Sequence, residues 1–270
     1  MLSNGQTRER FARRHDDKIE KAAKAGWFSK GSLYVTLGVL AVMAAVGAGG
    51  EIEGGKGVMQ WVAGQPFGQF LLVIAGIGFS AYALWRFVQA VVDPEHHKSD
   101  KREAAKRIGW GLSGVMHASL AVACFQMLNG GGGQSKKMWL DQALTQSWGP
   151  WLVGALGVFV VGVGLYQFKK SAELGFMDDV ETSKMSASET KTLKIVGRMG
   201  HAARGVVFPI IGYFLVKAAV EANPAEAKGV GGALHQIAQA GWFWMALVAV
   251  GLAAYGVLNL FYAKYRRVNV

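Results

Sequence analysis

Six long runs of apolar residues, separated by short polar stretches, dominate the hydropathy pattern of the chain. They cover approximately residues 31–49, 67–92, 109–128, 149–168, 205–222 and 241–263. The hydrocarbon core of a bilayer is about 30 Å thick, so a helix needs about 20 apolar residues to cross it. Each run comes near that length. The pattern therefore predicts an all-α integral membrane protein with six transmembrane helices, and argues against six buried helices of a water-soluble protein.

A short sequence phrase opens the first, third and fifth runs. Each copy has a basic residue, a glycine two places on and a second glycine five places after that, and the copies begin at Lys24, Arg107 and Arg198. The second run of each copy also repeats, with matching starts at Gly68, Gly149 and Gly241. A repeat of fixed design sets the architecture of a chain before any single motif does. The six predicted helices therefore form three tandem two-helix repeats.

The repeats predict a division of the chain into a basic cytoplasmic arm (1–23), repeat 1 (24–95), a charged inner linker (96–106), repeat 2 (107–176), a polar inner linker (177–196) and repeat 3 with a basic tail (197–270). Within the arm, Arg8 to Lys24 carries a thin apolar stripe, which favours either a helix lying on the lipid surface or a partly disordered arm. Glycines stud the second helix of each repeat, and small residues let helices approach closely in lipid. We expect the second helices to form the tightly packed centre.

The outer connection of each repeat carries a small apolar cluster at helical spacing. Residues at i, i+3 and i+4 lie on one face of a helix. The three clusters are Val58, Trp61 and Val62; Leu140, Ala143 and Leu144; and Leu234, Ile237 and Ala238. We expect three short amphipathic helices at the outer interface, with Trp61 and Trp139 at the depth of the lipid headgroups.

Charge is scarce and unevenly placed. Only 17% of the 270 residues are charged and the net charge is +11, whereas soluble domains carry about 25% charged residues. Of the 29 lysines and arginines, the three odd-numbered connections hold only Lys56, Lys136, Lys137, Lys217 and Lys228. An excess of basic residues marks the cytoplasmic side of a membrane protein. Both termini are therefore predicted to be cytoplasmic, where the basic surface is expected to contact anionic lipid headgroups rather than nucleic acid.

Few residues in the predicted spans support catalysis or ligand binding. The chain has no phosphate-binding glycine loop, zinc-protease motif or nucleophile motif, and its single cysteine, Cys124, excludes an internal disulfide. We expect no catalytic residue, cofactor or metal. His117 lies within a span, where a titratable group is costly and is a functional candidate. With Tyr82 and Tyr255 it forms a candidate mid-membrane polar site, and its alternative is a neutral side chain hydrogen-bonded to a neighbouring helix.

Basic and polar residues recur at the inner ends of the predicted spans. Lys30 and Arg204 occupy equivalent positions in the repeated phrase, and with Arg107 and Arg198 they are predicted to contact lipid phosphate or another anion. Helix N-termini favour acids, so cations there require something negative nearby. A polar residue also recurs near the inner end of the second helix of each repeat: Arg86, Gln167 and Asn259. We expect these three residues to form a polar ring, which either snorkels to the interface or contacts a substrate.

The three repeats, each opened by a Gly-x-x-x-Arg-Gly-like phrase, resemble the bacterial membrane family called domain of unknown function 1206. The phrase is fullest at Gly200, Arg204 and Gly205, and the middle copy departs from it with Ser113-Gly114. The resemblance covers roughly residues 24–265. It implies six spans, a bacterial plasma (inner) membrane and no assigned activity.

Many packing glycines and few catalytic groups favour a scaffold, an accessory protein or a lipid-associated interaction protein, with lipid and other membrane proteins as partners. The alternative is a small-molecule or ion transporter or channel with pseudo-threefold repeats, since transporters bind substrates where repeats meet. A membrane enzyme is the third interpretation. A dry centre favours the scaffold, whereas a polar cavity lined by His117, Tyr82 and Tyr255 favours transport.

Overall fold

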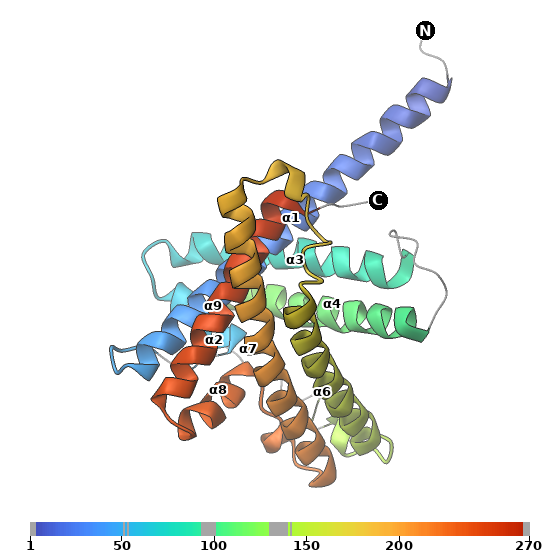
Figure 1. Ribbon diagram of the computed structural model, residues 1–270. Helices are drawn as coiled ribbons and strands as arrows, with labels where there is room; N and C mark the ends of the chain where they lie inside the picture. Colours follow the sequence, from blue (N-terminus) through green and yellow to red (C-terminus); the bar gives the residue numbers. More distant parts are fainter. Residues whose placement is uncertain are drawn as a thin grey trace.

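The structure, a computed structural model, describes residues 4–50, 52, 54–92, 101–129, 140 and 142–266, and these ranges are almost entirely helical (Figure 1). The helices are α1 (Asn4–Ala45), α2 (Gly55–Ala63), α3 (Gly68–Val92), α4 (Lys101–Leu128), α6 (Gly149–Glu173), α7 (Ala187–Val220), α8 (Val230–Gln239) and α9 (Trp242–Tyr265), with short 3-10 turns η1 (Thr182–Lys184) and η2 (Pro224–Glu226). Within the described ranges, the one extended pairing is an isolated bridge between Val180 and Arg266. The predicted all-α class is confirmed.

Six of these helices are long and apolar enough to cross a bilayer. The candidate spans are Glu20–Ala45, Gly68–Val91, Lys106–Leu128, Gly149–Glu173, Ala187–Val220 and Trp242–Tyr265. Their outer surfaces carry large apolar side chains, such as Trp151 at 82% exposure and Val220 at 81%. Water-soluble proteins rarely leave such side chains in large exposed patches, whereas lipid covers them. The chain is therefore a six-span membrane protein, as its apolar runs predict.

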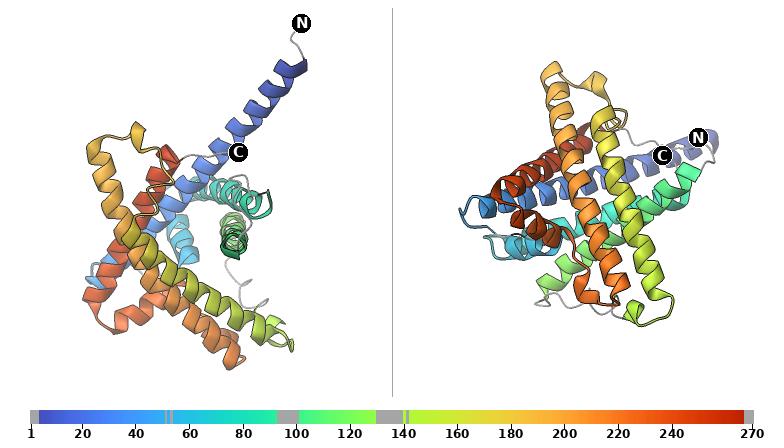
Figure 2. Two further views of the ribbon diagram at one scale, coloured as in Figure 1. Left: turned by 45° about the vertical axis from the view of Figure 1, so that its right-hand side comes forward. Right: turned by 60° about the horizontal axis from the view of Figure 1, so that its bottom comes forward.

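The closest helix pairs join different repeats. The second helix of each repeat packs along the first helix of the next, in the pairs α3 with α4 and α6 with α7, and the last helix, α9, packs along the first, α1 (Figures 1 and 2). The three repeats thus form a ring in which each contacts the other two, and within the described residues this ring is open between α4 and α6. The prediction that the second helices form the packed centre is wrong, because within the described residues α3, α6 and α9 contact one another little. Several of their glycines, such as Gly157 and Gly256, serve the pairs between repeats.

Equivalent glycines hold these three pairs together. A Cβ atom added to Gly31 would lie 2.7 Å from Leu260 of α9, one on Gly114 would lie 2.8 Å from Phe87 of α3, and one on Gly205 would lie 2.9 Å from Phe168 of α6. The three partners occupy the same position of the second helix in their repeats. Close backbone approach through small residues is how helices associate in lipid. The second glycine of the repeated phrase therefore allows close contact between its helix and the preceding repeat.

Short helices follow the first and fifth spans. Helix α2 buries Val58, and α8 buries Leu234 and Ile237, so the apolar faces predicted for them pack against the spans. The predicted middle helix is described only at Leu140 and residues 142–144, which are helical. Trp139 and residues 93–100, which include the first part of the charged inner linker, lie outside the described residues.

The basic arm is part of the first span helix. Helix α1 runs without interruption from Asn4 to Ala45 and carries its first part away from the body of the protein (Figure 1). A helix lying on the lipid surface would need a bend before the span, and the chain has no proline there to make one. The surface-lying helix predicted for Arg8 to Lys24 is therefore wrong. In the later part of the chain, a capping box formed by Ser186 and Glu189 starts α7.

Candidate functional site

Lys30 lies between two tyrosines that come from different repeats. Its ammonium nitrogen is 3.2 Å from the hydroxyl of Tyr82 on α3 and 3.2 Å from the hydroxyl of Tyr255 on α9. It also lies within 5.3 Å of both ring centroids, close enough for a cation–π attraction. The Lys30 side chain is buried, as are both tyrosines. Helices α1, α3 and α9 therefore meet at one buried ammonium group.

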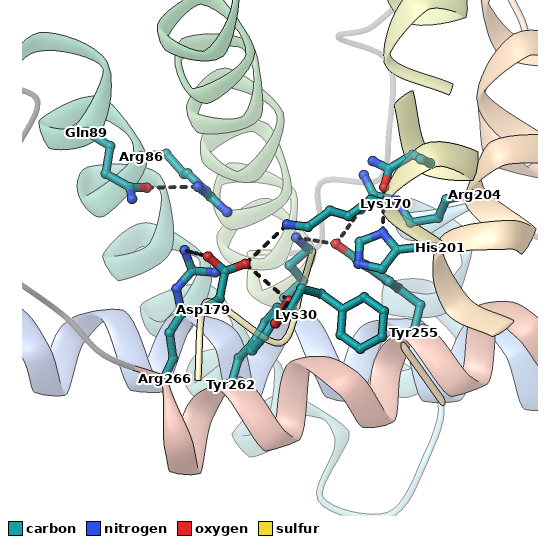
Figure 3. Close-up of polar contacts among 12 residues, drawn as sticks. Lys30, Arg86, Gln89, Lys170, Asp179, His201, Arg204, Tyr255, Tyr262 and Arg266 are labelled. Carbon is teal, nitrogen blue, oxygen red and sulfur yellow. Dashed lines mark hydrogen bonds and ion pairs between the residues drawn. The ribbon is translucent and has the colours of Figure 1, made fainter. Parts of the chain in front are cut away.

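Each tyrosine hydroxyl also accepts a hydrogen bond from an arginine. Arg86 Nε donates to Tyr82 over 2.9 Å. Arg204 donates to Tyr255 (Figure 3). Each guanidinium also lies against the ring of its tyrosine, at 4.9 Å for Arg86 and 4.3 Å for Arg204. The resulting chain of contacts runs Arg86–Tyr82–Lys30–Tyr255–Arg204. We call these five residues the cationic cluster.

The cationic cluster contains three positive charges, and no described carboxylate forms an ion pair with any of them. Cations elsewhere in the described residues do have such partners, as Lys170 has Asp179 at 3.1 Å and Lys217 has Glu226 at 2.8 Å. Hydrogen bonding from Lys217 also lowers the pKa of Glu226, which lies in the outer connection. A charge buried in low dielectric without a counter-charge costs several kcal/mol, in order of magnitude. The cluster is therefore a place where a negative charge is strongly favoured.

The cluster lies where the three repeats converge. Repeats 1 and 3 supply Lys30 and Arg204 from one repeat position, and Tyr82 and Tyr255 from another. The middle repeat supplies no charge at these positions, because it has Ser113 and Val163 there. The cluster thus follows the threefold repeat, but the middle repeat contributes no charge to it.

His117 belongs to this site but does not bond a neighbouring helix. Its Nδ1 is 2.7 Å from the carbonyl oxygen of Ser113, one turn earlier on α4, so Nδ1 carries the proton and donates it. The centroid of its ring lies 4.5 Å from that of Tyr82. The structure thus brings together all three residues of the candidate mid-membrane site, His117, Tyr82 and Tyr255. Lys30 joins them, although no local pattern in the chain predicts that it does.

A second buried polar group adjoins Tyr255. His201 Nδ1 is 2.6 Å from Oε1 of Gln167, and the Asn259 amide donates to the backbone oxygen of Tyr255 over 2.6 Å. Three buried polar atoms of this region have no partner among the described residues: His201 Nε2, Asn259 Oδ1 and Arg204 Nε. Unpaired buried polar atoms are rare, and each has a structural or functional reason. Here two acceptors and one donor are open to a further group.

The segment after α6 covers the inner end of this region. Phe176 is fully buried and stacks on His201, with ring centroids 5.4 Å apart. Asp179 fixes the segment through Lys170 at 3.1 Å and Arg266 at 3.4 Å (Figure 3). Burial raises the pKa of Asp179, but the two cations outweigh it and hold that pKa below its ordinary value. The ionised carboxylate therefore pins residues 174–181 to the inner ends of α6 and α9.

The remaining predicted residues lie outside the cluster. Arg107 donates to the backbone oxygen of Ala90 over 2.8 Å, at the end of α3, and Arg198 is exposed at the start of the fifth span. The predicted polar ring is divided: Arg86 enters the cluster, Gln167 binds His201 and Asn259 binds its own helix. Among the described residues, no group of three or more histidine, cysteine, aspartate or glutamate side chains is placed to hold a metal ion.

Sequence patterns miss the roles of two residues of the site. Gln167 is predicted to belong to a polar ring but binds His201, and Phe176 lies in a connection that is predicted only to be polar. One signal exists for the first: Gln167 and His201 share repeat positions with Arg86 and Trp110, which lie on the contacting helices α3 and α4. Nothing in the local sequence distinguishes Phe176 from an ordinary loop residue.

Comparisons with known proteins agree with the repeat architecture. The family model described as "Domain of Unknown Function (DUF1206)" matches residues 25–93, 108–172 and 199–266, which confirms the resemblance inferred from the repeated phrase. An uncharacterized protein of Bacillus subtilis (strain 168), YxxB, is 34% identical over 255 residues, covering 93% of this chain and 92% of the relative. No solved structure matches the chain.

Proposed function

This chain belongs to the DUF1206 family, whose description assigns no activity, so we propose its function from the site: it is a membrane protein that binds an anionic group in the cationic cluster. One observation carries the proposal. Lys30, Arg86 and Arg204 converge on two tyrosine hydroxyls, and no described carboxylate neutralises them. A phosphate or carboxylate group would supply the missing charge, whether it is carried by a lipid or by a soluble molecule.

The geometry suits an oxyanion. Guanidinium groups present several N–H donors in one plane, which match phosphate and carboxylate oxygens. Arg204 Nε is one such donor, buried and without a partner among the described residues. The two tyrosine hydroxyls hold the three cations at fixed positions around one small region. The cationic side chains therefore lose less conformational entropy when an anion binds there.

We propose that the protein resides in the plasma membrane with both termini cytoplasmic. The end of α9 lies near the start of the first span, since Arg266 lies over the ring of Trp27 at 4.8 Å, so both chain ends share one side. The basic residues concentrated on that side support a cytoplasmic location. The same surface would attract anionic lipid headgroups.

A polar centre bears on the choice between scaffold and transporter. A purely structural protein gains nothing from one buried and two partly buried cations, because replacing buried charges with apolar groups often raises stability. Transporters place their substrate sites where repeats meet. We therefore favour a ligand-binding role, in which the anion is carried or held, over a dry scaffold.

Thermal unfolding of the purified full-length protein in a neutral detergent tests the proposal. Inorganic phosphate, glycerol phosphate and a matched ionic strength of sodium chloride are added to the parent protein, to Lys30→Gln/Arg204→Gln, and to Lys169→Gln. Lys169 is 60% exposed, which makes it the matched control. A ligand at about 100 times its dissociation constant stabilises the folded state by about 2.7 kcal/mol.

We expect the phosphate compounds to stabilise the parent protein and the Lys169→Gln control more than chloride does. The double variant should be at least as stable without anion, since one buried and one partly buried charge are gone, but should gain nothing from phosphate. Equal stabilisation of the double variant and the parent protein would overturn the proposal.

A further inference from the structure

Two of the three repeats are closed between their own helices, and the middle one is not. Helix α1 packs on α3, and α7 packs on α9. In the parts of the chain that the structure describes, α4 and α6 scarcely touch, and they run in clearly different directions in Figure 1. Helices α4 and α6 are also the two least buried spans. We call the boundary between them the α4–α6 seam.

The sequence explains this difference at two repeat positions. In repeats 1 and 3, Tyr82 and Tyr255 press on Gly26 and Gly200, where an added Cβ atom would lie 2.8 Å and 2.6 Å from the tyrosine Cα atoms. The middle repeat has Val163 in place of the tyrosine.

The second position lies one turn earlier on the same helices. Gly78 and Gly251 contact the first helix of their own repeats at Ser29 and Ala203. The middle repeat has Phe159 there. Its ring reaches across to Gly109, where an added Cβ atom would lie 3.9 Å from Cζ. A bulky ring in place of glycine keeps the two backbones apart, so Phe159 is the side chain that spans the seam.

The seam borders the binding site. Helix α4 carries Ser113 and His117, and α6 carries Gln167; His117 lies against Tyr82 of the cationic cluster, and Gln167 binds His201 beside Tyr255. The inner approach is covered by the segment that Asp179 pins, with Phe176 fully buried on His201. The seam is therefore the least obstructed side of the cluster.

Both helices that flank the seam are apolar and exposed. On α4, Val115, Met116 and Val122 are each more than half exposed. On α6, Leu152, Val158 and Leu165 are each more than half exposed as well. A soluble anion has no reason to approach between such surfaces, but an acyl chain does, because apolar contact there continues that of the bilayer.

We infer that the ligand is an anionic phospholipid that enters sideways through the α4–α6 seam. Its headgroup phosphate reaches Lys30, Arg86 and Arg204, and its acyl chains remain between α4 and α6 against Phe159. The inference rests on the proposed anion site and adds the class of ligand and its route. Charge complementarity selects the occupant, since a zwitterionic lipid or a second copy of the chain would not neutralise the cluster.

Native mass spectrometry of the full-length protein tests the inference with lipids of matched acyl chains. Phosphatidylglycerol and phosphatidylcholine are added separately, and retained lipid is counted. The key variant, Phe159→Gly/Val163→Tyr, gives the middle repeat the residues that close the other two. The control variant, Phe243→Gly/Leu247→Tyr, makes the same kinds of change at the same four-residue spacing on an exposed face of α9, away from the seam.

The parent protein and the control should retain phosphatidylglycerol in preference to phosphatidylcholine. The closing variant should retain it about tenfold more weakly, while inorganic phosphate stabilises that variant against heat as it does the parent protein. Phe159→Ala serves as a second variant, which leaves the seam open and should retain phosphatidylglycerol at least as well as the parent protein.

Undiminished phosphatidylglycerol retention by a folded closing variant would overturn the lateral route while leaving the anion site intact. Loss of retention only in Lys30→Gln/Arg204→Gln would overturn that route as well. Failure of the anion site itself has another signature: phosphate would stabilise neither the parent protein nor the closing variant.

Discussion

The outer repeats and the middle repeat share their packing positions and differ at the positions that face the repeat junction. Gly31, Gly114 and Gly205 make equivalent contacts with the preceding repeat. By contrast, Lys30 and Arg204 correspond to Ser113 in the middle repeat. The scaffold is therefore threefold, and the polar site placed on it is not.

This difference separates the residues that pack the repeats together from the residues that form the polar site. A structural repeat needs the same contact three times, and the glycines provide it. A binding site needs charge on one side and a path for its ligand on another. The loosely packed middle repeat leaves room for such a path. Three predictions test the separation, from the largest expected effect to the smallest.

The first compares Gly200→Ala with Gly109→Ala. The new methyl group at Gly200 would lie 2.6 Å from the Tyr255 Cα atom, whereas at Gly109 its nearest neighbour is Phe159 Cζ at 3.9 Å. Overpacking against backbone costs about 1–3 kcal/mol, and alanine gains up to about 1 kcal/mol over glycine within a helix. We expect Gly200→Ala to unfold at a clearly lower temperature than the parent protein, and Gly109→Ala at the same or a higher one. Equal losses in the two variants would mean that the middle repeat packs like the others.

The second compares the shared hydroxyls with an exposed one. Tyr82→Phe and Tyr255→Phe each remove an acceptor that two cations use, which should lower stability by about 1–2 kcal/mol. Tyr213 is 60% exposed, and its hydroxyl makes no hydrogen bond among the described residues, so Tyr213→Phe is the control. Thermal unfolding without added anion measures all three. If the control loses as much as the other two, the hydroxyls do not hold the cluster.

The third and smallest effect concerns pH and the inner segment. The pKa of Asp179 in the folded protein lies below its ordinary value of 3.8, because Arg266 and Lys170 outweigh its burial. A lowered pKa stabilises the folded state at pH above the unfolded-state pKa, and this contribution is lost as pH falls through the folded-state pKa. The difference in unfolding temperature between the parent protein and Asp179→Asn should therefore be constant from about pH 7 to about pH 5 and shrink only below that range. A difference that already shrinks near pH 6 would show that Asp179 does not hold the segment.

Sequence patterns predict the fold of this chain well, because its architecture follows from local rules. Apolar length predicts the six spans, and the repeated phrase predicts their grouping. Ring closure is beyond the reach of these patterns, since contact between α1 and α9 depends on how three repeats curve and not on any local signal. The prediction about the centre is wrong because glycines show that a helix packs closely, but not against which partner.

The site is predictable only in pieces. Depth and repeat position group His117 with Tyr82 and Tyr255, whereas charge and repeat position group Lys30 with Arg204. The structure joins the two groups through the Lys30 side chain. A lysine near the inner start of a span looks the same in sequence whether it extends toward the headgroups or folds inward. Only the tyrosines of two other helices decide which it does.

Ring closure also has a consequence for synthesis. Lys30 is translated with the first repeat, but one of its two hydroxyl partners, Tyr255, follows 225 residues later. Until that last hairpin is inserted, the first helix has half of its polar contacts and lacks the neighbour that packs along it. Chains shortened before α9 should therefore be targets for membrane proteases, and the whole ring assembles only once its final piece has arrived.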